Sequence, residues 1–257
     1  MAVYTTEIAS DKITSDNPIH QRLLQAYYLA TDFVGGKLLE VGCGEGRGID
    51  VVLPHCDSYT GIDKIEEVIS RLRSKYETLE FIAGNIPPFH MFGDESFDSV
   101  ISFQVIEHIR DDRMFLQEIS RVLRPGGVAL LTTPNIKMSL SRNPWHIREY
   151  TPQQLAELAS PYFSKVEMKG ITGNEKVMKY YAMNKASVER ITRFDLFNLQ
   201  YRLPASLLRI PYEFLNRLNR NKLKDSDDEL TRSITNDDYL LVDDASGALD
   251  LFCILTR

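Results

Sequence analysis

Residues 38–49 read Leu-Leu-Glu-Val-Gly-Cys-Gly-Glu-Gly-Arg-Gly-Ile, a short apolar run that ends in alternating glycines, beginning with Gly42, Gly44 and Gly46. This pattern is typical of a buried strand that runs into a tight loop. Glycine tolerates positive φ and lets a ligand lie against the main chain without a Cβ in the way. Backbone amides of the loop, and the N-terminus of the helix that follows, can face a polar or anionic group. The sequence therefore predicts a ligand-binding loop.

The glycine spacing separates two classes of nucleotide site. A dinucleotide-binding loop has the pattern G-x-G-x-x-G, and its third glycine would fall on Arg47. Here an acid, Glu40, precedes the loop, and a second short strand beginning at Tyr59 ends in Asp63. A carboxylate in that place can accept hydrogen bonds from two ribose hydroxyls. The loop taken alone is also compatible with a turn that binds nothing, but together with Asp63 it favours a nucleotide-like cofactor.

At residues 38–63 the chain resembles the class I S-adenosylmethionine-dependent methyltransferases, in particular small-molecule methyltransferases of type 11. The stretch 118–135, which reads Glu-Ile-Ser-Arg-Val-Leu-Arg-Pro-Gly-Gly-Val-Ala-Leu-Leu-Thr-Thr-Pro-Asn, resembles the same family. The resemblance covers about residues 35–172 and, weakly, the last strand. It implies that S-adenosylmethionine is the cofactor, that the glycine loop lies under its methionine part and that Asp63 binds its ribose.

One position departs from the family pattern. The family usually carries an aspartate, in contact with the adenine amino group, where this chain has Asn85. The asparagine side-chain oxygen can still accept that hydrogen bond. In the glycine loop, Cys43 is expected to serve as a small side chain and not as a nucleophile. The cofactor-binding residues implied by the resemblance are Glu40, Gly42, Cys43, Gly44, Gly46, Asp63, Lys64, Asn85, Ile86 and Gln104.

Composition limits the classes of function. The 257-residue chain has a net charge of −6, which argues mildly against nucleic acid as the substrate. No apolar run approaches the roughly 20 residues of a membrane span, and the first residues lack a signal pattern, so we expect a cytoplasmic protein. Cys43, Cys56 and Cys253 are scattered, which predicts neither a zinc site nor disulfides. No cluster of histidines and carboxylates has a ligand spacing that suggests a required metal.

Strand and helix signals alternate along the chain, which predicts an α/β fold with a doubly wound, seven-stranded, Rossmann-like sheet. A long segment separates the sixth predicted strand from the last one, at about residues 249–255. A structureless loop of that length is improbable. We therefore predict an inserted helical cap over residues 175–235, before the last strand. The S-adenosylmethionine-binding domain then comprises residues 1–174 and 236–257.

Apolar spacing places helices of the cap at about residues 186–201 and 206–218, and the polar segment 225–238 is expected to be a mobile linker. Basic residues outnumber acids between residues 175 and 224, so the helices are amphipathic and basic. Three interpretations stay open: a lid over the substrate, a dimer contact, or a surface that rests on an anionic membrane. In a lid, the arginines could hold an anionic substrate such as a phosphorylated sugar or lipid.

Residues 104–108 are candidates for the reaction site because ligands of an open parallel sheet bind beyond the carboxyl ends of its strands. Methyl transfer from a sulfonium mainly requires that the acceptor atom is held close and aligned. A general base is needed only if the acceptor must lose a proton. His108 and His146 have suitable ordinary pKa ranges, and His108 is the first candidate because it follows a strand end. Its alternative role is to orient the next helix.

Substrate contacts are expected first in the loop before residue 152. This loop concentrates Trp145, Arg148 and Tyr150 just past a central strand, and Thr151 caps the helix that follows. The alternative is that Arg148 and Glu149 hold the loop against the domain.

A second group of substrate contacts is expected near the N-terminus. Residues 1–17 are polar and predict a loosely held arm, followed by a helix from Pro18. In the resembled family such a helix often lies over the mouth of the site, so His20 and Tyr27 are substrate-binding candidates. The alternative is that the helix packs its aromatic face on the sheet.

The sequence thus predicts an S-adenosylmethionine-dependent methyltransferase that acts on a small-molecule, glycan or lipid-like acceptor, with oxygen slightly preferred. A nicotinamide-dependent oxidoreductase is disfavoured by Arg47. A cofactor-binding regulatory or membrane-surface module without transferase activity remains the alternative. We expect a monomer or homodimer, with peripheral membrane contact through the basic cap as one option.

Overall fold

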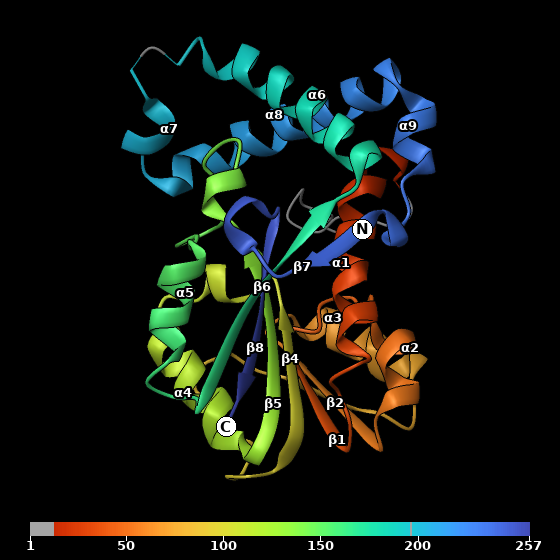
Figure 1. Cartoon of the computed structure of the whole chain (residues 1–257), viewed down its shortest axis with the longest axis vertical. Helices are drawn as coiled ribbons and strands as arrows, with labels where there is room; N and C mark the ends of the chain where they lie inside the picture. Colours follow the sequence, from red (N-terminus) through yellow and green to blue (C-terminus); the bar gives the residue numbers. More distant parts are fainter. Residues whose placement is uncertain (1–12, 196) are drawn as a thin grey trace.

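The computed structural model describes residues 13–195 and 197–257. Within them, one sheet with helices on both faces forms the body of the protein (Figure 1). Strands β1 to β5 run parallel, and β8 and β7 run antiparallel to their neighbours, in the order β3-β2-β1-β4-β5-β8-β6-β7. The strands are β1 Lys37–Val41, β2 Ser58–Asp63, β3 Glu80–Ala83, β4 Phe97–Phe103, β5 Leu123–Pro134, β6 Lys165–Gly173, β7 Tyr239–Val242 and β8 Asp250–Thr256.

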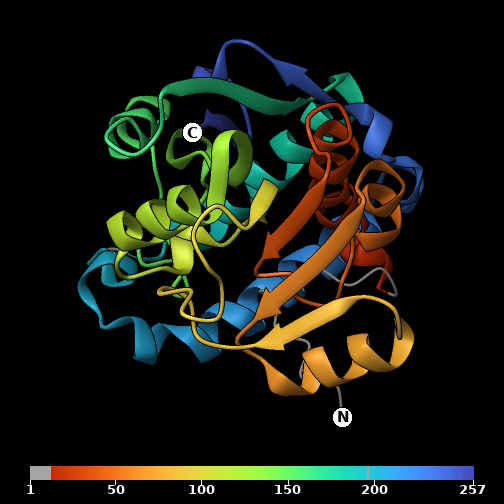
Figure 2. The same cartoon turned by 90° about the horizontal axis from the view of Figure 1, so that it is seen from below.

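Strand β7 corrects the predicted count of seven strands. It pairs with β6 at the edge of the sheet, so the strands of the described residues form a mixed, Rossmann-like sheet of eight. Its four residues, Tyr-Leu-Leu-Val, lie between acid-rich segments and are too few to give a periodic signal. Figure 2 shows β7 and β3 at opposite edges of the sheet.

Two helical layers cover the sheet (Figure 1). One contains α1 Asn17–Ala30, α2 Ile49–Val52 and α3 Glu66–Lys75; the other contains α4 Asp112–Val122 and α5 Pro152–Ala159. Helix α4 shows how the sequence makes such a layer. The Asp111 side chain caps it by accepting from the Met114 amide at 3.0 Å. Its apolar residues recur on one face, which is buried: Phe115, Leu116, Ile119 and Val122.

The remaining helices form a cap over the carboxyl ends of the parallel strands (Figure 1). They are α6 Glu175–Thr192, α7 Leu199–Arg202, α8 Ala205–Ser226 and α9 Asp228–Ser233. The predicted helix at 186–201 is wrong in its position, because Asn174 caps α6 by accepting from the Val177 amide at 3.2 Å. The division of the chain into a core and an inserted cap stays a prediction, and β7 separates these helices from the last strand.

The expected mobile linker at 225–238 is also corrected. It contains α9, which Asp227 caps by accepting from the Leu230 amide at 3.0 Å. The same carboxylate lies 2.8 Å from Lys179 Nζ, and Leu230 and Ile234 are buried. Four of its acids are caps or ion-pair partners, namely Asp225, Asp227, Asp228 and Asp238, and its two apolar residues join the core.

Asp16 anchors the cap to the N-terminal part of the chain. Residues 1–12 of the predicted arm lie outside the described residues, but Asp16 is fully buried. Its Oδ1 accepts from Arg217 Nη1 at 2.7 Å and from Arg220 Nη1 at 3.0 Å, both on α8. Removing one member of such a group leaves an uncompensated buried charge. Two arginines expected to hold an anionic substrate are thus engaged in holding the cap.

The strand order locates the ligand site. Strands β1, β2 and β3 lie in sequence order toward one edge of the sheet, and β4 then pairs with the other side of β1. In an open α/β sheet, ligands bind at this switch point, outside the carboxyl ends of the strands. The glycine loop follows β1 and Gln104 follows β4, so both lie there.

Candidate active site

The glycine loop has the backbone that its sequence predicts. Gly42 has φ +80°, and a Cβ on it would lie 2.4 Å from Val105 Cγ2, so only glycine fits. Gly44 has φ +50°, and a Cβ built on it meets nothing within 4 Å. The loop therefore offers a bare stretch of main chain with open space beside it.

Asp63 connects the end of β2 to this loop. Its Oδ2 accepts from the Gly44 amide and its Oδ1 from the Ile65 amide, both at 3.0 Å. The residue is half-buried, and a carboxylate with two oxygens has lone pairs left for further donors. Asp63 can thus shape the loop and still bind two hydroxyls.

Glu40 and Tyr27 are not placed as predicted. Glu40 is buried under the loop, where its carboxylate accepts from Tyr27 Oη at 2.6 Å and from Tyr59 Oη at 2.5 Å. Burial raises the pKa of Glu40 to about 7. Because Glu40 is only 1% exposed beneath the loop, the structure corrects the prediction of direct cofactor contact. Tyr27 likewise packs in the core, as its alternative role required, and does not reach a substrate pocket.

The other predicted cofactor residues surround the switch point. Lys64 and Asn85 are exposed at the ends of β2 and β3, and Ile86 is half-buried beside Asn85. The Cys43 thiol is buried, which raises its pKa and keeps it protonated. Gln104 has φ +59°, an unusual conformation for a residue with a side chain. Such backbone positions are often found at functional sites.

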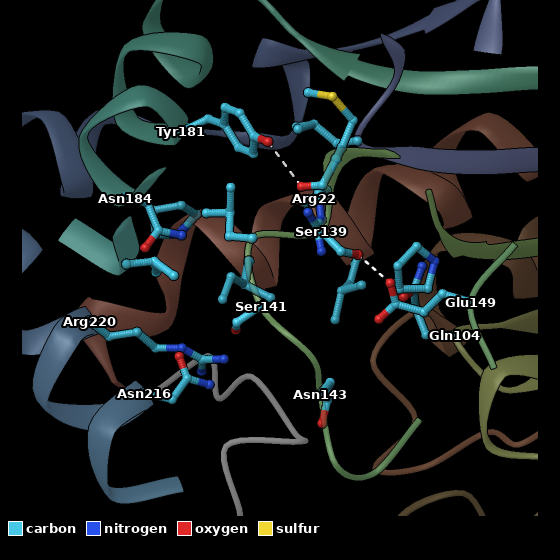
Figure 3. Close-up of a pocket in the computed structure, with 18 of the residues that line it drawn as sticks. Arg22, Gln104, Ser139, Ser141, Asn143, Glu149, Tyr181, Asn184, Asn216 and Arg220 are labelled. Atoms are coloured by element: carbon cyan, nitrogen blue, oxygen red, sulfur yellow. Dashed lines mark hydrogen bonds between the residues drawn. The ribbon is translucent and has the colours of Figure 1, made fainter. Parts of the chain in front are cut away.

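A polar cavity of about 280 Å³ lies between the carboxyl ends of β4 and β5 and the cap. Figure 3 shows its polar lining, which comes from the sheet, from α1 and from the cap helices. Helix α1 contributes Arg22, and α6 and α8 contribute Asn184 and Asn216. His20 does not line this cavity, although it lies two residues from Arg22. Helix α1 therefore reaches the cavity as predicted, but through Arg22 and not through His20.

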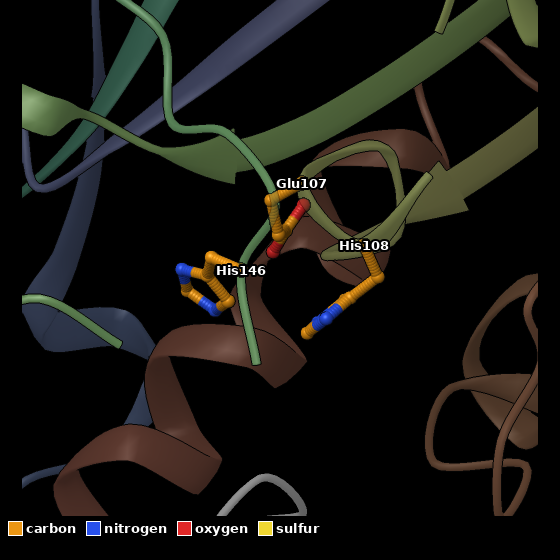
Figure 4. Close-up of side chains that lie close together, drawn as sticks. All are labelled: Glu107, His108 and His146. Atoms are coloured by element: carbon orange, nitrogen blue, oxygen red, sulfur yellow. The ribbon is translucent and has the colours of Figure 1, made fainter. Parts of the chain in front are cut away.

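Glu107 is the most unusual group on the cavity wall (Figure 4). It is 1% exposed, and its Oε2 accepts from Thr133 Oγ1 at 3.0 Å. Its Oε1 has no hydrogen-bond partner among the described residues. Burial raises the pKa of Glu107 to about 7. A buried carboxyl that titrates near neutral pH is suited to accept a proton.

His108 lies next to this carboxyl and is neutral. Its Nδ1 lies 3.0 Å from the Trp145 carbonyl oxygen, which can only accept, so Nδ1 carries the proton. Burial and the nearby His146 lower the pKa of His108 to about 4. A group with this pKa is a weak base at pH 7, so His108 ranks behind Glu107 as a proton acceptor.

His146 is held at both ring nitrogens. Its Nδ1 lies 2.6 Å from Glu149 Oε1, and its Nε2 accepts from Asn143 Nδ2 at 2.8 Å. Its ring meets that of His108 edge-on, with 5.0 Å between the centroids. To act as a base, His146 would first have to release Asn143.

The three residues also form a cluster that sequence spacing did not predict. One potential metal-ligand atom from each of Glu107, His108 and His146 lies within 4.8 Å of the others. The three residues are brought together by the fold and not by their spacing in sequence, and the expectation that no metal is required stays a prediction. In the observed arrangement His146 is hydrogen-bonded through both ring nitrogens and His108 through Nδ1.

The predicted substrate residues of the loop hold that loop in place. The Arg148 guanidinium pairs with Asp112 on α4, and Tyr150, which is buried, donates to the same carboxylate at 2.9 Å. The Trp145 ring lies 4.0 Å from the Arg209 guanidinium carbon. None of the three loop side chains lines the polar cavity. Arg148 therefore contacts the domain through Asp112, which agrees with its alternative role of holding the loop against the domain.

Sequence reasoning missed several residues of the cavity. In the loop after β5, Ser139 donates to Glu149 (Figure 3). Asn143 of the same loop binds His146. The polar residues between β5 and Thr151 were a signal for this group. In the cap, Asn216 and Asn219 lie one turn apart on α8 and face the cavity, and asparagines on the inner side of an amphipathic helix were a signal for these.

Comparisons with known proteins agree with this geometry. Residues 39–131 match the family described as methyltransferase domain. A probable S-adenosylmethionine-dependent methyltransferase of Mycolicibacterium smegmatis is 40% identical over 144 residues, which cover 54% of this chain and 56% of that protein. The phthiotriol/phenolphthiotriol dimycocerosates methyltransferase of Mycobacterium leprae is 30% identical over 171 residues, covering 63% and 61%. The chain thus spans about half the length of several curated relatives that it matches.

A solved structure shows the same fold over most of the chain. It is an S-adenosylmethionine-dependent methyltransferase from Thermotoga maritima, described as a possible histamine N-methyltransferase. The TM-score is 0.58 at 13% identity, and the match covers 93% of this chain and 91% of that one. The methyltransferase family model thus matches residues 39–131, and the solved structure shares the fold that surrounds them.

Proposed function

We propose that the protein transfers a methyl group from S-adenosylmethionine to a small-molecule, glycan or lipid-like acceptor, preferably at a hydroxyl oxygen. The observation that carries this proposal is the buried, unpartnered Oε1 of Glu107 on the wall of the polar cavity. A hydroxyl group has a proton to give to this oxygen when its own oxygen forms the new bond to carbon. A tertiary amine or a thioether has no such proton.

The residues at the switch point fit the cofactor. The open space beside Gly44 leaves room for its methionine part, and Asp63 can accept from its ribose hydroxyls. Asn85 is exposed at the end of β3, where it can receive the adenine amino group. When bound, S-adenosylmethionine supplies a methyl group that is attached to a sulfonium sulfur. After the transfer, the rest of the cofactor is a neutral thioether. We propose that Lys64, Ile86 and Gln104 complete this site.

The chain then has two tasks, to hold the acceptor and to accept its proton. We assign the proton to Glu107 Oε1, with Thr133 fixing the second carboxyl oxygen. His108 stays neutral beside it, and His146, held by Glu149 and Asn143, forms the facing wall. Side chains of α6 and α8 line the cap side of the cavity, opposite the ends of β4 and β5.

The name of the Mycobacterium leprae relative supports a lipid-related acceptor. An acceptor panel tests the proposal, with methyl-labelled S-adenosylmethionine and either 1-dodecanol, dodecylamine or methyl glucoside. We expect label in an alcohol and none in the amine, because dodecylamine is protonated at neutral pH and has no lone pair to attack the methyl group, whereas an alcohol can give its proton to Glu107. Label in the amine alone would overturn the preference for oxygen. No label in any compound, although S-adenosylhomocysteine binds, would favour the alternative below.

The alternative is a cofactor-binding, membrane-surface module without transferase activity. It is favoured by an outward apolar stripe on α8, formed by Leu207, Ile210, Phe214 and Leu218, in which Ile210 is 81% exposed. Exposed arginines accompany it on the cap: Arg190, Arg193 and Arg202. A basic amphipathic helix can bind an anionic lipid surface.

The same stripe would be the contact surface in a homodimer. Among the described residues, no helix has the length and apolarity that crossing a membrane requires.

Vesicle sedimentation tests the membrane alternative. With phosphatidylglycerol–phosphatidylcholine vesicles, this alternative predicts that the wild type sediments and that the double variant Ile210→Ser, Phe214→Ser sediments at least tenfold less, because two anchoring side chains are lost. Leu240→Ser is the matched control, since Leu240 is exposed on β7, outside the cap. Equal sedimentation of all three proteins would remove the alternative.

A further inference from the structure

A second cavity, of about 410 Å³, lies within the cap. It is bounded by α6, α7 and α8 and by the loop at residues 141–144. Most of its lining is apolar, including Val188, Ile191, Phe194, Leu203, Leu208 and Leu215. A cavity of this composition favours hydrocarbon over a polar ligand.

The two cavities adjoin each other. Residues that line both are Ser141, Val188, Tyr212, Asn216 and Asn219. The polar cavity ends at Glu107 on the sheet side, and the apolar cavity extends from the shared residues into the cap. A single elongated ligand can therefore have one polar end at Glu107 and one apolar end among the cap helices.

The mouth of the apolar cavity is formed by aromatic rings that are exposed to water. Phe194 and Phe197 line the cavity, yet they are 77% and 69% exposed. Removing such apolar surface from water is favourable. A bound chain that covers these rings would thus gain affinity at the mouth as well as inside.

The floor of the cavity is fixed to the loop that carries the active-site residues. Arg142 Nη1 donates to the Gln200 carbonyl at 2.8 Å and to the Leu203 carbonyl at 3.1 Å. Asn143, the next residue, donates to His146. The position of a chain in the cap is therefore linked, through two adjacent residues, to the position of the group that faces the reacting end.

We propose that the apolar cavity binds the hydrocarbon chain of an amphiphilic acceptor whose hydroxyl-bearing end lies beside Glu107. This inference rests on the proposed function, and it narrows the acceptor from small molecules in general to amphiphiles with one extended apolar chain. Tyr212, Asn216 and Asn219 lie where the polar and apolar parts of the ligand meet.

Titration with 11-(dansylamino)undecanoic acid, read from directly excited dansyl emission, tests the inference. We expect saturable binding to the wild type. Leu208→Trp fills the cavity and should raise Kd at least tenfold. Leu207→Trp places the same side chain on the outer stripe, because Leu207 is 64% exposed and does not line the cavity, and should change Kd less than twofold.

A second pair of variants guards against loss of folding. Leu215→Gln introduces a polar group into the cavity with little change in side-chain volume. Leu218→Gln makes the same substitution on the outer stripe, outside the cavity. Weaker probe binding in the first alone supports the inference. Equal probe binding in the wild type and both cavity variants, or no probe binding at all, would overturn it.

A thermal-shift measurement with S-adenosylhomocysteine on the same proteins separates this inference from the proposed function. If S-adenosylhomocysteine binds every variant but the probe binds none, the chain site is refuted and the methyltransferase proposal stands. If the probe binds selectively but S-adenosylhomocysteine does not bind, the chain site stands and the proposed function fails.

Discussion

Glu107→Gln is expected to lower kcat by about 10²- to 10⁴-fold, the range that general bases contribute. Glutamine has nearly the same shape and can still accept from Thr133 through its amide oxygen, but it cannot take a proton from the acceptor. The loss should therefore appear in kcat and leave the affinity for S-adenosylhomocysteine unchanged. Steady-state kinetics with the acceptor found in the panel, and a binding titration, measure the two effects.

The pH profile provides a second readout of the same substitution. Because burial raises the pKa of Glu107 to about 7, the carboxyl is protonated and inactive as a base below that pH and ionised above it. Activity of the wild type should thus rise between about pH 6 and pH 8 and then level off. In Glu107→Gln this rise should disappear.

Glu157→Gln is the matched control for Glu107→Gln, because Glu157 is an exposed acid on α5. It should retain wild-type kcat and the same pH profile. A kcat of Glu107→Gln within threefold of the wild type would show that the acceptor needs no base here, and that the site works by positioning alone.

Asp63→Ala is expected to weaken S-adenosylhomocysteine binding by roughly 10²-fold or more. A hydrogen bond to a charged group contributes about 1.5–3 kcal/mol, and two ribose hydroxyls would lose their acceptor. The substitution also removes the acceptor of the Gly44 amide, which loosens the glycine loop. Isothermal titration calorimetry measures the effect.

Glu66→Ala is the control for this loss of charge. Glu66 lies three residues further on, where it pairs with Arg73 at 3.3 Å on the exposed surface. Removing the Glu66 carboxylate should leave the Kd for S-adenosylhomocysteine within twofold of the wild-type value. If Asp63→Ala bound S-adenosylhomocysteine as well as Glu66→Ala does, Asp63 would have only its structural role in the loop.

The glycine loop and Asp63 could be predicted from sequence because their signals are local. A few residues of apolar strand, a glycine spacing and a strand-end acid specify the conformation of the segment that contains them. The same holds for Thr151, whose capping box with Gln154 lies within four residues. Lys64, Asn85, Ile86 and Gln104 keep their predicted roles as proposals.

The arrangement around Glu107 could not be predicted, because it depends on contacts between distant segments. Thr133 meets Glu107 across 26 positions, and Arg217 meets Asp16 across 201. Glu40 shows the same difficulty. An acid before a glycine loop is a local pattern, but two buried tyrosines, one of them from α1, determine where its carboxylate points.

The cap was the least predictable part. Its apolar residues were evident, but the sequence did not show which of them face a cavity and which face outward. On α8, Leu208 and Leu215 line the cavity although Leu215 is 43% exposed, whereas Leu207 and Ile210 do not line it. Only the packing of α6, α7 and the loop at Arg142 against α8 separates them.

The central claim, that the chain binds S-adenosylmethionine at the switch point, is tested most directly by thermal unfolding of the wild type with S-adenosylhomocysteine, with NAD as the control. At about a hundredfold excess over Kd, a ligand that binds only the folded state adds roughly 2.7 kcal/mol to the free energy of unfolding. We predict an increase of several degrees in Tm with S-adenosylhomocysteine and none with NAD. An unchanged Tm with S-adenosylhomocysteine, or an equal increase with NAD, would contradict the claim.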